Sequence, residues 1–298
     1  MNIMMTGGTG FIGQELGFKL VGSGHKLKIV TRDQESAKRK LNFSSEFIEC
    51  DLNSEALKAS DFADIDVIIN LAGESVDGRW TAEKKKLIKE SREQTTRHLL
   101  LNCPNTVKTI VTASAQGFYG DRGNEALNED TPKGAGFLAE VCDAWEAPFR
   151  KKLNQRVVIL RIGLVLSKKG GALKKMMSLF KNYLGAELGS GEQWMSFISL
   201  DDLTNLFCAC VEDANWTGVV NAVNNKPVQN KYFTRVLVEA LGVIQLPRVP
   251  KFMLKIVLGE MSELVLASLK VYSAKSEQNN FKCRDLDLAE FLKRELAD

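Results

Sequence analysis

Residues 4–13 read MMTGGTGFIG, and this stretch decides the fold. The apolar run at residues 3–5 is typical of a buried strand, and glycines follow it at positions 7, 10 and 13. Leu16, Leu20 and Val21 then fall on one face of an amphipathic stretch. A strand, a glycine turn and a helix in this order form the site that holds a dinucleotide pyrophosphate. The alternative is an ordinary glycine-rich turn.

Each glycine has a separate function in this interpretation. Gly7 can take a positive φ in the tight turn, Gly10 lets phosphates approach the backbone, and Gly13 lets the helix pack close to the strand. The N–H groups of Phe11, Ile12 and Gly13 then lie at a helix N-terminus, which carries roughly half a positive charge. We therefore expect the pyrophosphate to contact Gly7, Thr9, Gly10, Phe11, Ile12 and Gly13.

The composition is that of an ordinary globular chain with one or two domains. Its 298 residues are 44% hydrophobic and 26% charged, and a net charge of +3 gives no argument for nucleic acid or a membrane surface. The first strand begins too early to leave room for a signal peptide. Six cysteines without a CxxC spacing and only two histidines predict no metal site. We expect a cytoplasmic protein that binds no nucleic acid, membrane or metal.

The most apolar long stretch of the chain runs from Phe252 to Leu269. Lys255, Gly259, Glu260 and Glu263 interrupt it, so it is not a membrane span. We expect a buried pair of helices here.

The residue after the second strand, predicted at 26–31, decides between NAD and NADP. An acidic group there binds the ribose hydroxyl of NAD, whereas a basic group accepts the 2′-phosphate of NADP. We assign Thr31 and Arg32 to the cofactor, with Arg32 on the phosphate and Lys38 and Arg39 as helpers. The alternative is a solvated Arg32 with Asp33 on the ribose. The pattern favours NADP over NAD.

Strands and helices alternate over the first half of the chain, which predicts an α/β fold with a doubly wound parallel sheet. Residues 1–164 form the predicted NAD(P)-binding Rossmann-type domain. Residues 165–298 form a smaller, mostly helical substrate lobe, although segments near 195–222 are expected to return to the sheet. The further strands are predicted at 47–50, 66–71, 106–114 and 157–163, the long helices at 81–102 and 132–154, and later helices at 171–184, 231–241, 251–257, 260–268 and 285–295.

Ligands bind at the carboxyl ends of the strands in such sheets. The residues that we expect near the cofactor at these ends are Asp51, Leu52, Leu71, Ala72, Gly73 and Gly163. The residues that we expect near a substrate are Glu74, Arg79 and Trp80 in one loop and Gln193 and Trp194 in a glycine-rich loop. Trp80 can equally anchor the helix that follows it.

With these residues assigned, the sequence resembles the extended short-chain dehydrogenases/reductases. The shared motifs are TGGTGFIG at 6–13, NLAG at 70–73, FYG at 118–120 and SFISLDDL at 196–203. Longer motifs, among them ASAQGFYGDRG at 113–123 and GSGEQWMSFISLDDL at 189–203, resemble an atypical bacterial epimerase-like subgroup related to nucleoside-diphosphate-sugar epimerases. Its relatives include a plastid division protein and a human mitochondrial member. The resemblance implies NADP binding and a small-molecule substrate such as a nucleotide sugar, and it is compatible with a homodimer through helices 81–102 and 132–154.

The chain departs from this resemblance at the catalytic pair. Active members of the superfamily carry Tyr-x-x-x-Lys, in which the lysine lowers the pKa of the phenol for proton transfer. Here Phe137 and Val141 occupy these positions. Counting back from FYG, the usual catalytic serine falls on Ala115, beside Ser114, and Ser91 stands where many relatives carry asparagine.

Two functional hypotheses remain, and the polar loops favour the first. The first is an NADP-dependent oxidoreductase or epimerase-like enzyme with a relocated proton donor, in which Tyr119 acts beside Arg122 or Arg79 and Ser114 polarises the carbonyl. Tyr119 can equally be a packing residue. The second is a catalytically silent NADP-binding sensor or assembly partner, as the missing acid pair indicates. A purely structural homodimer is a third alternative.

Overall fold

The computed structural model describes residues 1–151 and 154–297, and its centre is a parallel sheet of seven strands. The strand order is β12-β7-β5-β4-β1-β2-β3, and every neighbouring pair runs parallel. The predicted α/β class with a doubly wound sheet is therefore confirmed. The strands are β1 (Asn2–Thr6), β2 (Lys26–Thr31), β3 (Glu46–Glu49), β4 (Val67–Asn70), β5 (Thr109–Ala115), β7 (Arg156–Ile162) and β12 (Gly218–Ala222).

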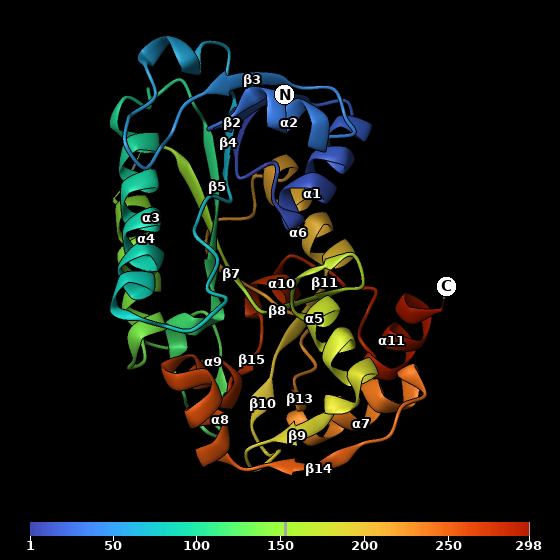
Figure 1. Ribbon diagram of the computed structural model, residues 1–298. Coiled ribbons are helices and arrows are strands. Elements are labelled where there is room, and N and C mark those ends of the chain that lie inside the picture. The colour runs from blue at the N-terminus through green and yellow to red at the C-terminus, as the bar shows by residue number, and fades with distance from the viewer. Residues whose placement is uncertain (152–153, 298) are drawn as a thin grey trace.

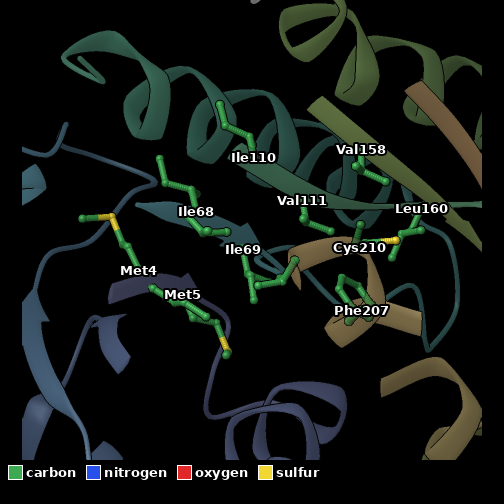
Figure 2. Packing of buried hydrophobic residues seen from close by; sticks show 14 of the residues in the cluster. Met4, Met5, Ile68, Ile69, Ile110, Val111, Val158, Leu160, Phe207 and Cys210 are labelled. Atoms are coloured by element: carbon green, nitrogen blue, oxygen red, sulfur yellow. The ribbon is translucent and has the colours of Figure 1, made fainter. Parts of the chain in front are cut away.

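Helices cover both faces of the sheet (Figure 1). Helices α3 (Ala82–Leu101) and α4 (Phe137–Arg150) pack together on one face, whereas α1 (Phe11–Gly22) and α6 (Leu200–Glu212) pack together on the other. The short α2 (Gln34–Lys40) connects β2 to β3. A sheet covered on both faces needs strands that are apolar throughout. Figure 2 shows this core: Met5, Ile69 and Val111 from three adjacent strands point to the face where Phe207 and Cys210 of α6 lie, whereas Met4, Ile68 and Ile110 point to the opposite face.

The C-terminal lobe has its own small hydrophobic core, to which α5, α7 and α11 contribute. Because β12 pairs with β7, the chain returns from this lobe to the main sheet. The division into residues 1–164 and 165–298 stays a prediction. The elements are β8 (Leu164–Ser167), α5 (Gly171–Leu179), η3 (Phe180–Leu184), β9 (Ala186–Leu188), β10 (Trp194–Met195), β11 (Phe197–Ser199), β13 (Val228–Gln229), α7 (Asn230–Leu241), β14 (Leu246–Val249), α8 (Lys251–Leu258), η4 (Gly259–Met261), α9 (Ser262–Leu266), β15 (Lys270–Val271), α10 (Ala274–Gln278) and α11 (Leu288–Leu296).

Several predicted helices are shorter in the structure. The predicted helix at 132–154 begins only at Phe137, because Gly136 before it has a φ of +107°, outside the helical region. It ends at Arg150, and residues 152 and 153 lie outside the described residues. The predicted helix at 171–184 ends at Leu179 and continues as one π-helical turn. The remaining short elements are η1 (Ala59–Phe62), η2 (Gln116–Tyr119) and β6 (Ala126–Leu127).

The expected burial of the stretch after residue 252 is wrong for α8. Only Leu254 of this helix is buried, whereas Phe252 and Ile256 are 64% and 70% exposed. Met253 and Val257 are also exposed, so α8 carries apolar side chains on both its inner and outer sides. The apolar pattern indicates a helix but does not tell which side packs on the protein. Within the described residues, no helix combines the length and hydrophobicity that crossing a bilayer requires.

Candidate cofactor and active site

The glycine turn after β1 has the tight geometry that its spacing predicts. Gly7 has a φ of +68°, and a Cβ on it would lie 2.8 Å from the Leu71 carbonyl carbon. A Cβ on Gly13 would lie 2.4 Å from the Gly7 oxygen, so only glycine lets α1 pack this close to the turn. Gly10 differs, because the only neighbour of a Cβ there would be the Gly7 oxygen at 3.1 Å. The front of the turn is therefore open at Gly10.

The first amides of α1 are available to a ligand. The first intrahelical bond joins the Gln14 N–H to the Gly10 oxygen at 3.0 Å. In the described part of the chain, the N–H groups of Phe11, Ile12 and Gly13 have no backbone acceptor, and no side chain caps this helix. Thr9 is half-buried, and its backbone carbonyl accepts a hydrogen bond from the side-chain amide of Gln14. A helix N-terminus with unpaired N–H groups and no acidic side chain in its first turn binds anions.

A chain of buried hydrogen bonds ties the carboxyl ends of three strands together beneath this turn. The Thr6 hydroxyl donates to the Asn70 side-chain oxygen at 2.7 Å, and the Asn70 amide donates to the Thr112 hydroxyl at 3.1 Å. The amides of Leu71 and Ala72 donate to the Thr6 hydroxyl. The ends of β1, β4 and β5 are thus held in one fixed arrangement.

Arg32, which follows the last residue of β2, has a guanidinium that is free to bind a ligand. Arg32 is exposed, and within residues 1–151 and 154–297 its side chain has no hydrogen bond or ion pair. Asp33, the alternative ribose ligand, caps α2 instead, because its carboxylate accepts a hydrogen bond from the Ser36 N–H at 2.8 Å. The Thr31 hydroxyl forms hydrogen bonds with the backbone of Asp33, and Lys38 forms an ion pair with Glu35. Arg32 is thus a cation that the structure leaves available here, and Arg39 on α2 is also exposed with no hydrogen bond or ion pair within the described residues.

The other residues predicted near the cofactor lie at the carboxyl ends of the strands. The Asp51 carboxylate accepts hydrogen bonds from Asn53, and Leu52 beside it is buried. Gly73 packs against the guanidinium of Arg92, because a Cβ added to Gly73 would lie 3.2 Å from the Arg92 Cζ atom. Gly163 is packed closely, because a Cβ would lie 2.8 Å from Val223.

The segment from β8 to α5 crosses over the glycine turn. A Cβ on Gly170 would lie 2.5 Å from the Phe11 ring, so this turn rests on the first residue of α1. One helical turn further on, the Lys175 ammonium binds the Asp77 carboxylate at 2.5 Å. Asp77 lies in the loop after β4 and also accepts a hydrogen bond from Ser75. The Asp77–Lys175 ion pair therefore joins α5 to the loop after β4.

Neutralising this ion pair is expected to speed the dissociation of NADPH. Both side chains are 58% exposed, and exposed pairs typically contribute about 0.2–1 kcal/mol, so Asp77→Asn and Lys175→Met should each raise the dissociation rate about 1.4- to 5-fold. The hydrogen bond from Lys175 lowers the pKa of Asp77, so the pair is present above roughly pH 4 and is lost as the pH falls through the folded-state pKa. Stopped-flow NADPH fluorescence measures the rate. Lys174→Met, which changes an exposed neighbour of Lys175, is the control, and unchanged rates in both variants would contradict the expectation.

The two residues predicted to be catalytic lie in one buried polar network. The Ser114 hydroxyl donates to the Glu146 carboxylate at 2.6 Å, and Arg161 donates to both oxygens of Glu146 at 2.9 and 2.8 Å. Arg161 also donates to the Tyr119 hydroxyl at 3.0 Å, which in turn donates to the Asn221 side-chain oxygen at 2.7 Å. All five side chains are at least nine-tenths buried.

This network does not favour proton transfer by Tyr119. The side chain is fully buried, and burial raises the pKa of its phenol. Both predicted cation partners are elsewhere, since Arg122 pairs with Glu125 and Arg79 is exposed in its loop. Arg161 supplies the neighbouring cation instead, and its guanidinium also lies 3.3 Å from the centroid of the Phe118 ring. A catalytic Tyr119 would require the network to open, and this role stays a prediction.

Apolar side chains fill the place of the usual Tyr-x-x-x-Lys pair. Phe137 packs edge to face against Trp80 with 5.3 Å between ring centroids, and the Lys85 ammonium lies 4.9 Å from the Phe137 centroid. Val141 is buried in the same cluster, to which Met261 also belongs. Ser91 accepts a hydrogen bond from the Glu74 backbone amide. Nothing in this cluster can donate a phenolic proton.

Several of the residues predicted to face a substrate make contacts within the protein, and their role toward a substrate stays a prediction. Trp80 is 5% exposed and donates to the Val76 carbonyl, so it anchors its loop. Gln193 is buried and donates to the Leu188 carbonyl at 2.9 Å. The Trp194 indole N–H donates to the Asn124 side-chain oxygen, and the Lys270 ammonium makes a cation–π contact with the Trp194 ring. Only Glu74, paired with Lys84, and Arg79 remain exposed beside the loop after β4.

Sequence reasoning missed three residues that shape this region, namely Glu146, Arg161 and Lys175. The sequence does contain a signal that Arg161 is important, because it is the one charged residue in the otherwise apolar run VVILRIG at 157–163. A charge in a buried strand needs a buried partner. Nothing local pointed to that partner, which lies on α4, 15 positions earlier.

Comparison with known proteins agrees with this architecture. Residues 3–223 match the NAD dependent epimerase/dehydratase family, and residues 249–295 match a domain of unknown function, DUF1731. The chain is 34% identical to the chloroplastic "Epimerase family protein SDR39U1 homolog" of Arabidopsis thaliana, over 95% of this chain and 83% of that protein. It is 33% identical to "Epimerase family protein YfhF" of Bacillus subtilis, over 100% of this chain and 99% of that protein.

Solved structures give the same result. The human epimerase family protein SDR39U1 (isoform 2) with NADPH matches with a TM-score of 0.88 at 26% identity, and each chain covers 100% of the other. A nucleoside-diphosphate sugar epimerase from Corynebacterium glutamicum matches with a TM-score of 0.78 at 29% identity, over 99% of this chain and 58% of that chain. The resemblance stated from the sequence motifs is confirmed.

Proposed function

Because the chain belongs to the NAD dependent epimerase/dehydratase family, we propose that it is an NADP(H)-binding epimerase-like or oxidoreductase enzyme without the Tyr-x-x-x-Lys pair. The glycine turn and the first amides of α1 would hold the pyrophosphate, and Arg32 would hold the 2′-phosphate. The bound nicotinamide would supply hydride chemistry. The substrate is a small molecule, and the family favours a nucleotide sugar. The proposal includes a cytoplasmic location and leaves a homodimer open.

One observation carries the choice of NADP over NAD. Arg32 is free at the end of β2, whereas the carboxylate that would bind a ribose hydroxyl is used to cap α2. A free guanidinium recognises a phosphate with two parallel hydrogen bonds. The human SDR39U1 structure was obtained with NADPH, which agrees with this assignment.

Replacing Arg32 by alanine is expected to weaken NADPH binding and to leave NADH binding unchanged. The Kd for NADPH should rise by about 10- to 100-fold, because a hydrogen bond to a charged group contributes about 1.5–3 kcal/mol. Isothermal titration calorimetry with both cofactors measures the difference. Arg97→Ala, which removes an exposed arginine on α3, is the matched control. Equal losses for NADPH and NADH, or no loss for either, would rule out Arg32 as the phosphate ligand.

The chemistry of the enzyme has to use a proton source other than residue 137. Ser114 and Tyr119 remain the candidate polar groups in this proposal, and both are tied to the network around Glu146 and Arg161. A positioned general acid is worth about 10²–10⁴ in rate, so we expect slow turnover unless the network opens. The assay is substrate-dependent NADPH oxidation together with chromatographic detection of epimers from a panel of nucleotide sugars.

The packing of Phe137 favours a second candidate, a catalytically silent NADP-binding sensor or assembly partner. Trp80, Phe137 and Val141 form an apolar cluster where an active enzyme needs an acid and a cation. This alternative retains NADPH binding with no turnover. Stoichiometric, substrate-dependent NADPH consumption or catalytic epimer formation by the purified protein would exclude it.

A further inference from the structure

The turn between β8 and α5 packs on the first residue of α1. Its ends form an antiparallel pair, with bridges between Leu166 and Gly171 and between Ser167 and Gly170. A Cβ on Gly170 would lie 2.5 Å from the Phe11 ring, and one on Gly171 would lie 3.0 Å from it. Gly170 has an extended φ of −176°, so it is the close packing on Phe11, and not the backbone conformation, that requires a glycine there. The position of this turn therefore determines how much room the Phe11 side chain has.

The C-terminal helix α11 holds the 167–170 turn from the other side. The Glu295 carboxylate accepts hydrogen bonds from the Ser167 hydroxyl at 2.9 Å and from the Lys168 backbone N–H at 2.7 Å. The Lys168 ammonium also donates to the Ala297 carbonyl at 3.2 Å. Ser167 is buried, and hydrogen bonds to a charged acceptor are stronger than those between neutral groups. Glu295 therefore attaches the turn to α11 at two points.

Both helices that contact the turn are themselves anchored. The buried side chains that pack α11 into the core of the C-terminal lobe are Leu288, Phe291 and Leu292. On the side of α1, the Lys169 ammonium forms an ion pair with the Glu15 carboxylate at 2.8 Å. A displacement of the turn away from α11 would reach the Phe11 side chain, and the N–H of Phe11 is one of the free amides at the start of α1.

We propose that Glu295 is a positioning residue that slows the release of NADPH by holding the 167–170 turn on Phe11. Glu295 acts through the turn: its carboxylate fixes the turn, the turn fixes the Phe11 ring, and the Phe11 N–H keeps its direction toward the phosphates. This role rests on the proposed NADP(H) binding. Glu295 is the last of the residues 249–295 that match the domain of unknown function DUF1731. The C-terminal region thereby takes part in retaining the cofactor.

Removing the acceptor is expected to speed dissociation and to leave association almost unchanged. Glu295→Ala should raise the NADPH dissociation rate about 3- to 10-fold, the effect of losing one net hydrogen bond, as measured by stopped-flow fluorescence. The association rate should change by less than about twofold, because Arg32 and the open front of the glycine turn are kept. Glu295→Gln keeps an oxygen that can accept both hydrogen bonds and should release NADPH at the wild-type rate. Glu290→Ala, at an exposed position on the same helix, is the control.

Two further measurements show whether the effect passes through the turn. The Lys168 amide loses its acceptor in Glu295→Ala, so without cofactor its proton should exchange with deuterium faster than in wild type or Glu295→Gln. Gly170→Ala places a methyl group against the Phe11 ring and should itself speed NADPH release. Because both changes act on one turn, the double variant should dissociate more slowly than the product of the two separate effects predicts. Gly22→Ala adds a methyl group where a Cβ meets nothing within 4 Å, and it is the control for Gly170→Ala.

The outcomes separate this role from the proposed function. A faster dissociation that Glu295→Gln restores supports the role of Glu295. The role is overturned if Glu295→Ala releases NADPH at the rate of Glu290→Ala, if Glu295→Gln releases it as fast as Glu295→Ala, or if only association changes. In each of these cases NADPH binding stands, whereas wild-type protein that binds no NADPH overturns the proposed function itself. If Glu295→Ala does not fold, Ser167→Ala removes the buried donor of the same hydrogen bond and gives the same comparison.

Discussion

Gly10→Val is expected to abolish NADPH binding while the protein stays folded. Gly10 has a φ of −79°, which any residue can adopt, and the only atom within 4 Å of a Cβ there is the Gly7 oxygen. The valine side chain would therefore project into the open front of the turn, before the unpaired amides of Phe11 and Ile12. Each lost charge-assisted hydrogen bond weakens binding by about 1.5–3 kcal/mol, so two of them predict a loss of at least about 100-fold.

Calorimetry with NADPH measures this loss, and the thermal midpoint without cofactor shows whether the fold is retained. Gly22→Val is the matched control, because Gly22 ends the same helix and a Cβ there meets nothing within 4 Å. We expect it to bind NADPH as wild type does. A Gly10→Val protein with wild-type affinity would show that the phosphates do not lie over this turn.

Glu146→Ala should give the largest loss of stability. It removes the partner of Arg161, whose side chain is 3% exposed, and leaves a buried charge without compensation. Breaking a buried ion pair in this way typically destabilises by about 3–5 kcal/mol. For a chain of this size the melting temperature should fall on the order of 10 °C. Differential scanning calorimetry measures the change.

The same helix offers a control for this prediction. Glu140 pairs with Lys133 at 2.9 Å on the surface, so Glu140→Ala should lower stability by less than about 1 kcal/mol. The double variant Glu146→Leu/Arg161→Met should recover most of the loss, because apolar residues can replace a buried ion pair. If Glu146→Ala and Glu140→Ala have the same melting temperature, the buried network contributes no more to stability than a surface ion pair.

The cofactor half of the site could be predicted because it is local in sequence. The strand, the turn and the helix lie within 22 residues, and each glycine has a steric reason that one pattern expresses. Arg32 follows from its place after β2. That Asp33 caps α2 was not foreseen, although an aspartate three residues before Ser36 fits an N-cap.

The catalytic half could not be predicted in the same way, since its contacts are distant in sequence. Ser114 and Tyr119 were placed correctly at the end of β5, but their partners come from α4, β7 and β12, up to 102 positions away. No spacing rule connects such positions. The outer side of α8 was missed for a related reason, because apolar residues on both sides of a helix do not show which side meets the protein.

The hydrogen-bond chain from Thr6 through Asn70 to Thr112 ties the ends of β1, β4 and β5 together as the base of the site, whereas residues 75–79 form a loop beside it. Amide protons of Leu71 and Ala72, which bond the Thr6 hydroxyl, should exchange with deuterium only when the sheet itself opens. Those of residues 75–79, whose loop is held to α5 by one exposed ion pair, should exchange sooner. A cofactor bound here would then enter and leave by fluctuations of this loop, while the base of the site keeps its shape.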